Sequence, residues 1–75
     1  MWYRISIRYT DLSFRSGIRK IDDDNIYRVE MRVLETLKHS MHRILSVDIS
    51  PLPEDHTDVQ KIIQSGAPIK TFDTN

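Results

Sequence analysis

An alternation of apolar and polar residues marks the first element of the chain, residues 2–9, WYRISIRY. Successive side chains of a β-strand point to opposite faces of a sheet, so this pattern predicts a strand with one face in the core. The core face would carry Tyr3, Ile5, Ile7 and Tyr9. The other face would carry Trp2, Arg4, Ser6 and Arg8, and we expect it to be open.

A second pattern, with spacings of three and four, covers residues 26–45. Its apolar members are Ile26, Val29, Val33, Leu34, Leu37, Met41, Ile44 and Leu45. This spacing predicts an amphipathic helix of about five turns. The preceding residues 22–25, DDDN, can accept hydrogen bonds from free N–H groups, and their negative charge suits a helix N-terminus. We therefore expect the helix to start near Asn25.

The segments on either side of this helix are shorter. Ser16-Gly17, between Phe14 and Ile18, is either the two-residue turn of a short hairpin or part of a loop leading to the helix. Residues 46–50, SVDIS, predict a strand with Val47 and Ile49 inward, which Pro51 and Pro53 end.

Residues 54–66 predict a second helix. Thr57 and Gln60 have capping-box spacing, and Gly66 is placed to close the C-terminus. The inward side chains would be Val59, Ile62 and Ile63. Residues 67–72, APIKTF, predict an edge strand with Pro68 at its start, where a missing N–H does least harm.

This order of elements predicts an α+β fold. We expect a small β-α-β-α-β sandwich with a three-stranded sheet, four-stranded if Ser16-Gly17 closes a hairpin, and with both helices packed on one face. A helical connection normally leaves its flanking strands parallel. A chain of 75 residues has room for one core, so residues 1–75 are expected to form a single small domain.

The composition narrows the class of protein. With 39% hydrophobic and 29% charged residues, the chain is expected to fold as a globular protein. The absence of cysteine excludes disulfides, thiolate zinc sites and a cysteine nucleophile, and favours a reducing compartment. Arginines interrupt the N-terminal segment, and no apolar run approaches the ~18 residues of a membrane span. We expect a cytoplasmic protein.

Charge is balanced in total but not along the chain. Lysine and arginine number 11, as do aspartate and glutamate. Residues 1–45 hold nine basic and six acidic residues, and residues 46–75 hold two basic and five acidic residues. This asymmetry permits a local basic surface without the overall field of a dedicated nucleic-acid binder. No glycine-rich nucleotide motif is present, and we expect no cofactor.

Three groups of polar residues offer catalytic or metal chemistry, and each has a plainer interpretation. Glu35, His39 and His42 share one helical stripe and form a plausible metal-ligand set, but the stripe lies opposite the apolar face, which favours a solvated surface. DDDN is either a magnesium site or a helix cap, and capping explains it fully. Glu30 falls within the apolar arc, either as a catalytic acid or, as we favour, in an ion pair with Arg15 or Arg19 or on a first helical turn that overhangs the sheet.

Two surfaces suit a binding partner. The open face of the first strand would present Trp2, Arg4 and Arg8, which are residue types that anchor protein interfaces. A basic helix stripe would add Arg28, Arg32, His39 and Arg43. We therefore expect a small non-catalytic protein that binds another protein, as a homodimeric regulator or as an inhibitor of a larger target. The alternative is a single-stranded nucleic-acid-binding module that uses the same open sheet face and basic stripe.

Overall fold

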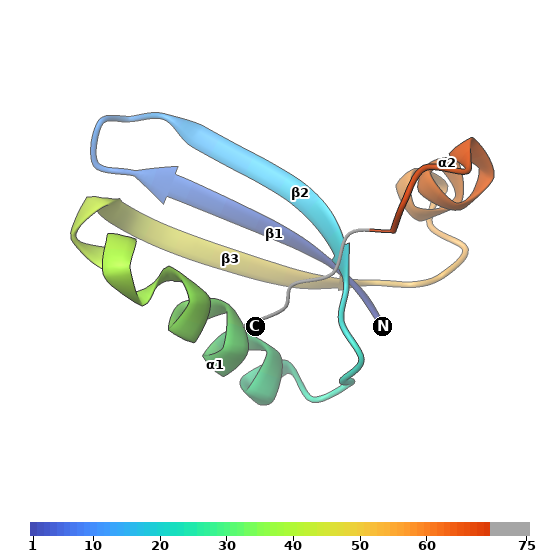
Figure 1. Ribbon diagram of the computed structural model, residues 1–75, viewed down its shortest axis with the longest axis horizontal. Coiled ribbons are helices and arrows are strands. Elements are labelled where there is room, and N and C mark those ends of the chain that lie inside the picture. Colours follow the sequence, from blue (N-terminus) through green and yellow to red (C-terminus); the bar gives the residue numbers. More distant parts are fainter. Residues whose placement is uncertain (70–75) are drawn as a thin grey trace.

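The computed structural model describes residues 1–69 and confirms an α+β fold (Figure 1). Its strands are β1 (Trp2–Tyr9), β2 (Phe14–Lys20) and β3 (Ile44–Leu52). Its helices are α1 (Ile26–Leu37), the 3₁₀ helix η1 (Lys38–Arg43) and α2 (Thr57–Ser65). The three strands form one sheet in the order β2-β1-β3, and β1 pairs antiparallel with both neighbours.

The hairpin between β1 and β2 turns earlier than Ser16-Gly17, which lie inside β2. The turn is built around Asp11, whose side chain accepts hydrogen bonds from the Ser13 hydroxyl and, at 2.9 Å, from the Ser13 backbone N–H. Leu12 adopts a left-handed conformation with φ of 70°. An aspartate that bonds its own backbone two residues on replaces the Gly-containing turn that the sequence suggested.

Because β2 precedes α1, the element order is β-β-α-β-α rather than β-α-β-α-β. The crossover through α1 therefore connects β2 to β3, which run parallel to each other on either side of β1. A helical connection between parallel strands is present as expected, but it connects β2 to β3 and not the first strand to β3. The first strand lies at the centre of the sheet and is antiparallel to both.

The predicted helix over residues 26–45 is too long. It ends as an α-helix at Leu37, continues as η1, and gives way to β3 at Ile44. Ile44 pairs with Tyr9 across the sheet, and Leu45 is 58% exposed rather than buried. The apolar spacing of this segment suits a helix locally, but pairing with β1 overrides that preference.

The two helices do not pack on one face, because Trp2 and Tyr3, which point to opposite faces, are both buried. On the face of α1, the buried core comprises Tyr3, Ile5, Ile21, Val29 and Val33, with Ile7, Ile26, Leu37, Val47 and Ile49 against it. On the face of α2, the core comprises Trp2, Leu52 and Val59, with Ile18 and Ile62 against it. The sheet is therefore covered on both faces, over different parts of its length.

Helix α2 begins and ends with local devices. The Nδ1 atom of His56 accepts the Asp58 backbone N–H at 3.1 Å, so His56 rather than Thr57 caps the helix. Gly66 closes the helix with φ of 69°, as predicted. Val59 is buried, whereas Ile63 is 41% exposed and was wrongly placed inward. Of the predicted strand over 67–72, residues 67–69 are not in a strand, and residues 70–72 lie outside the described residues.

Candidate functional site

Among residues 1–69, no strand pairs with the outer edge of β2, which presents a row of backbone hydrogen-bonding groups. Met1 and Ile21 exchange backbone hydrogen bonds at 2.9 and 3.0 Å, and Tyr9 donates to Ser13 at 3.0 Å. Hydrogen-bonded pairs alternate along an antiparallel ladder, so Arg15, Gly17 and Arg19 direct their backbone groups to β1. The backbone N–H and C=O groups that point outward belong to Phe14, Ser16, Ile18 and Lys20.

The edge of β3 is less able to accept another strand. Because β1 uses its odd-numbered residues to bond β2, its even-numbered residues bond β3. Pro51 lies opposite Tyr3, so its nitrogen faces the outer edge of β3. A proline there offers no N–H to an incoming strand and blocks pairing at that point. The seven residues of β2 contain no proline.

A groove of about 250 Å³ lies beside β2, on the face of the sheet that α1 covers only in part. We call it the β2 groove; its lining residues are Ile5, Ile7, Tyr9, Arg15, Ser16, Gly17, Arg19 and Leu37. In Figure 1, β2 is the outer strand on the side of the sheet away from α1. The helix therefore leaves part of the apolar surface of β1 within reach of solvent.

Two arginines flank the β2 groove. Arg15, Gly17 and Arg19 alternate along β2 and share the groove face, opposite Ile7, Ile5 and Tyr3 respectively. A Cβ atom at Gly17 would lie 2.7 Å from the Arg19 guanidinium, so the missing side chain makes room for this group over β2. Arg19 donates to the Ile18 carbonyl at 2.9 Å. Within residues 1–69, neither arginine forms an ion pair with a carboxylate.

A second hollow continues the groove toward the hairpin turn. Its volume is about 320 Å³, and its lining residues are Tyr9, Ser13, Arg15, Ser40 and Arg43. It shares Tyr9 and Arg15 with the β2 groove, so three guanidinium groups from β2 and η1 follow one continuous surface. This surface attracts anions, and its floor beside β1 is apolar.

The three partner-binding residues predicted on the open face of β1 lie in different surroundings. Trp2 is only 5% exposed, because α2 covers it, so the expected surface position of this ring is wrong. Arg4 forms an ion pair with Asp58 of α2 at 2.6 Å. Arg8 is exposed, and its neighbour on the same face is Phe14, which is 59% exposed. Of the three, Arg8 alone remains free for a partner among the described residues.

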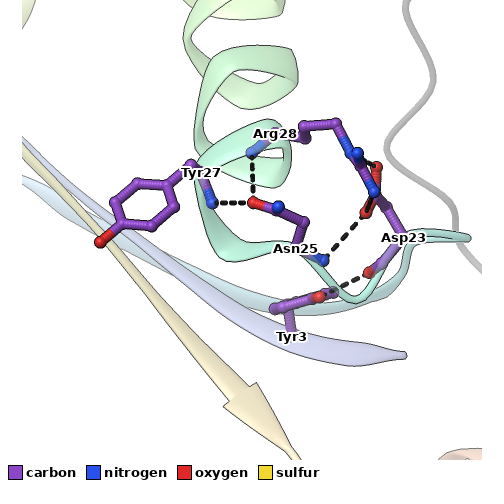
Figure 2. Close-up of polar contacts among 5 residues, drawn as sticks. All are labelled: Tyr3, Asp23, Asn25, Tyr27 and Arg28. Carbon is purple, nitrogen blue, oxygen red and sulfur yellow. Dashed lines mark hydrogen bonds and ion pairs between the residues drawn. The ribbon is translucent and has the colours of Figure 1, made fainter.

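The loop before α1 engages the first arginine of the predicted basic stripe (Figure 2). Arg28 donates to both carboxylate oxygens of Asp23, at 2.8 and 3.0 Å, and the Asn25 side chain accepts the first free N–H groups of α1. The bond from Arg28, together with the Asn25 backbone N–H, lowers the pKa of Asp23 to about 2. This pair raises the pKa of Arg28. The predicted capping role of DDDN is confirmed at Asn25.

The other members of the stripe do not lie along one continuous α-helix. Arg32 is half-buried on α1, His39 is exposed on η1, and Arg43 ends η1 beside the second hollow. The change from α-helix to 3₁₀ helix after Leu37 alters the angular spacing on which the stripe depended. Arg43 therefore lines the second hollow together with Arg15 and does not share a helix stripe with Arg28.

The polar sets considered for metal or acid chemistry are separated. Glu35 pairs with Lys38 at 2.7 Å, which lowers the pKa of Glu35. Among residues 1–69, no group of three histidine, aspartate or glutamate side chains lies close enough to hold a metal ion. Glu30 is exposed, so it is not the buried carboxylate that the helical wheel indicated.

Helix α1 also presents an apolar stripe to solvent. Tyr27, Met31 and Leu34 are spaced by four and three residues and are 75%, 70% and 41% exposed. Residues at these spacings lie on one side of a helix. In Figure 2, the Tyr27 ring points away from Asp23 and Arg28, so the stripe lies apart from that ion pair. Exposed apolar stripes of this kind are typical of protein interfaces.

Arg15 and Arg19 are the site residues that the sequence did not identify as such. The sequence FRSGIRK contained the pattern that could have identified them, because two arginines and a glycine occupy alternate positions in it. Reading that segment as a strand would place all three on one face. The interpretation as a turn hid this pattern, because Gly17 was taken as a turn residue rather than as a strand residue that makes room for the Arg19 guanidinium.

No helix within residues 1–69 is long and apolar enough to span a membrane. Comparison of the chain with models of known protein families, with curated proteins and with solved structures found no match.

Proposed function

We propose that this is a non-catalytic protein that binds another protein at the edge of β2, and that it acts as a regulator or inhibitor of a larger target. The observation that carries the proposal is the outer edge of β2, which no other strand within residues 1–69 pairs with, beside the β2 groove. Backbone groups on such an edge bind the backbone of another chain, and side-chain pockets beside it add specificity. A protein segment fits this combination.

The chemistry of the groove supports binding rather than catalysis. Its polar side chains are Arg15, Arg19 and Tyr9, since the Ser16 hydroxyl lies on the other face of the sheet, and no carboxylate or imidazole is among its lining residues within residues 1–69. The Ser16 hydroxyl lies 3.1 Å from the Ser6 hydroxyl. This set can hold anionic and apolar groups, but it offers no activated nucleophile.

A tagged pull-down from the lysate of the native host, performed with and without nuclease, tests this proposal when wild type is compared with two variants. Gly17→Val adds a side chain on the groove face and displaces the Arg19 guanidinium, whereas Ser46→Val adds bulk at an exposed position of β3. We expect a target protein to be recovered with wild type and Ser46→Val and to be lost with Gly17→Val. Recovery of the same protein with Gly17→Val would contradict a site at β2.

The same experiment addresses the alternative of a single-stranded nucleic-acid-binding module. Phe14 and Arg8 lie side by side on the open face, where an aromatic ring and a guanidinium could contact a base and a phosphate. Trp2 is buried and cannot serve as a stacking platform. Proteins that are recovered only without nuclease would favour nucleic acid and refute the β2 proposal.

We also propose that the apolar stripe of α1 mediates self-association. A homodimer would place Tyr27, Met31 and Leu34 of each copy against the same stripe of the other. The Met31→Glu variant should then sediment as a monomer, while Arg8→Glu, which changes charge on the other face of the sheet, should behave as wild type. A monomeric wild type at high protein concentration would contradict this assignment.

A further inference from the structure

We infer that β2 binds an acidic, extended segment of its target as a fourth strand of the sheet. This inference rests on the proposed function and adds the chemistry of the target segment. It follows from two features of β2: its outward backbone groups, and the alternation of Arg15, Gly17 and Arg19 on the groove face.

The register of such a pair assigns a side chain to each position. Residues directly opposite each other in neighbouring strands share a face and interact. Positions opposite Arg15 and Arg19 would carry carboxylates, because both arginines lack an ion-pair partner within residues 1–69. The position opposite Gly17 would carry an apolar side chain, because the groove on that face is lined by Ile5, Ile7 and Leu37.

The apolar position has a defined floor. Ile5, Ile7 and Leu37 line the β2 groove beneath Gly17, and Ile5 is the cross-strand neighbour of Gly17. The resulting pattern is acidic, any residue, apolar, any residue, acidic. It reads the same in both directions, so a parallel and an antiparallel strand both satisfy it.

Charge argues against a second copy of β2 as the occupant. The strand carries Arg15, Arg19 and Lys20 and has no acidic residue. Two copies would bring like charges together, and like charges on neighbouring strands are destabilising. Positive charge on an edge strand thus discourages self-pairing, while it leaves the edge available to a segment of opposite charge.

A synthetic peptide tests the inference directly. The probe is acetyl-Thr-Glu-Thr-Leu-Thr-Glu-Thr-amide, titrated into ¹⁵N-labelled full-length protein at low ionic strength. Because the N–H groups of Ser16 and Ile18 point outward, we expect their hydrogen exchange to slow on binding. The N–H groups of Arg15 and Gly17 already bond β1 and should change little.

Two control peptides separate strand pairing from plain attraction of charge. Lysine in place of both glutamates should weaken binding about tenfold, the order expected for reversing two exposed ion pairs. N-methylation of the backbone nitrogens that face β2 keeps the charges and should abolish binding. Equal binding of either control peptide, or no binding of the probe at millimolar concentration, would overturn the inference.

A variant with reversed charges on β2 distinguishes a loss of binding from a loss of the fold, because it should bind a peptide of the opposite charge. The Arg15→Glu/Arg19→Glu variant should lose the glutamate peptide and gain the lysine peptide, with slowed exchange at Ser16 and Ile18. Gain of the lysine peptide without that slowing would refute strand pairing. If the probe fails to bind while Gly17→Val still loses the target protein, the inference falls and the proposed function stands; if Gly17→Val keeps the target, the proposed function falls.

Discussion

Replacement of Trp2 by alanine should destabilise the protein severely. The ring is 95% buried against Leu52 and Val59, and Lys20 Nζ lies 5.9 Å from its centroid. Large-to-small substitutions of buried tryptophan cost about 3–5 kcal/mol, because transfer free energy is lost and a cavity remains. A domain of this length has a free energy of unfolding of roughly 4–11 kcal/mol. Trp2→Ala should therefore remove a large fraction of the total stability.

Urea denaturation followed by far-UV circular dichroism measures this loss. Two matched variants serve as controls: Trp2→Phe, which keeps an aromatic ring in the cluster and should lose less, and Arg8→Ala, an exposed position on the same face that should stay within about 0.5 kcal/mol of wild type. The native emission of Trp2, the sole tryptophan, should also be blue-shifted relative to the unfolded chain. A Trp2→Ala variant within about 1 kcal/mol of wild type would refute the packing of α2 over Trp2.

Three further variants test the ends of the helices. Asp23→Asn should alter the acid dependence of stability: the pKa of Asp23 is lowered from 3.8 to about 2, so its contribution is present at neutral pH and is lost as pH falls from about 4 to 2. The difference in unfolding free energy between wild type and Asp23→Asn should shrink over that range, and a constant difference would contradict the Arg28 pair. Asn25→Ala should cost about 0.5–2 kcal/mol in urea denaturation, whereas Asn25→Asp, which keeps an acceptor, should cost less; equal losses would argue against the observed cap. Gly66→Ala should lower the free energy of unfolding by about 1–2 kcal/mol, because Gly66 has a φ of 69°. No atom lies within 4 Å of the added Cβ, so the backbone conformation alone causes this loss. Gly66→Asn should lose less, and a fully stable Gly66→Ala would contradict the left-handed C-cap.

Features that depend on neighbouring residues were predictable from the sequence. The core face of β1 follows from alternation, and Tyr3 and Ile5 are buried as expected. The start of α1 follows from capping chemistry, and Asn25 accepts the N–H groups of Tyr27 and Arg28. The left-handed C-cap at Gly66 is likewise a local preference of glycine.

Features that depend on residues far apart in the chain could not be predicted from the sequence. The alternation of β1 places Trp2 on the surface, but Val59 of α2, which is far along the chain, packs against it and buries it. The helical segment gives way to β3 after Arg43, where Ile44 pairs with Tyr9, and periodicity cannot reveal this pairing. The β2 groove exists because α1 covers only part of its face of the sheet, and this depends on how helix and sheet are placed together.

Hydrogen exchange of the protein in complex with its captured target is the most direct measurement of the claim that β2 is the binding edge. The account predicts that the backbone amides of Ser16 and Ile18 exchange more slowly in the complex than in the free protein, while those of Arg15 and Gly17, which bond β1, change little. Amides of Ser16 and Ile18 that exchange at the same rates in the free and bound protein would contradict it.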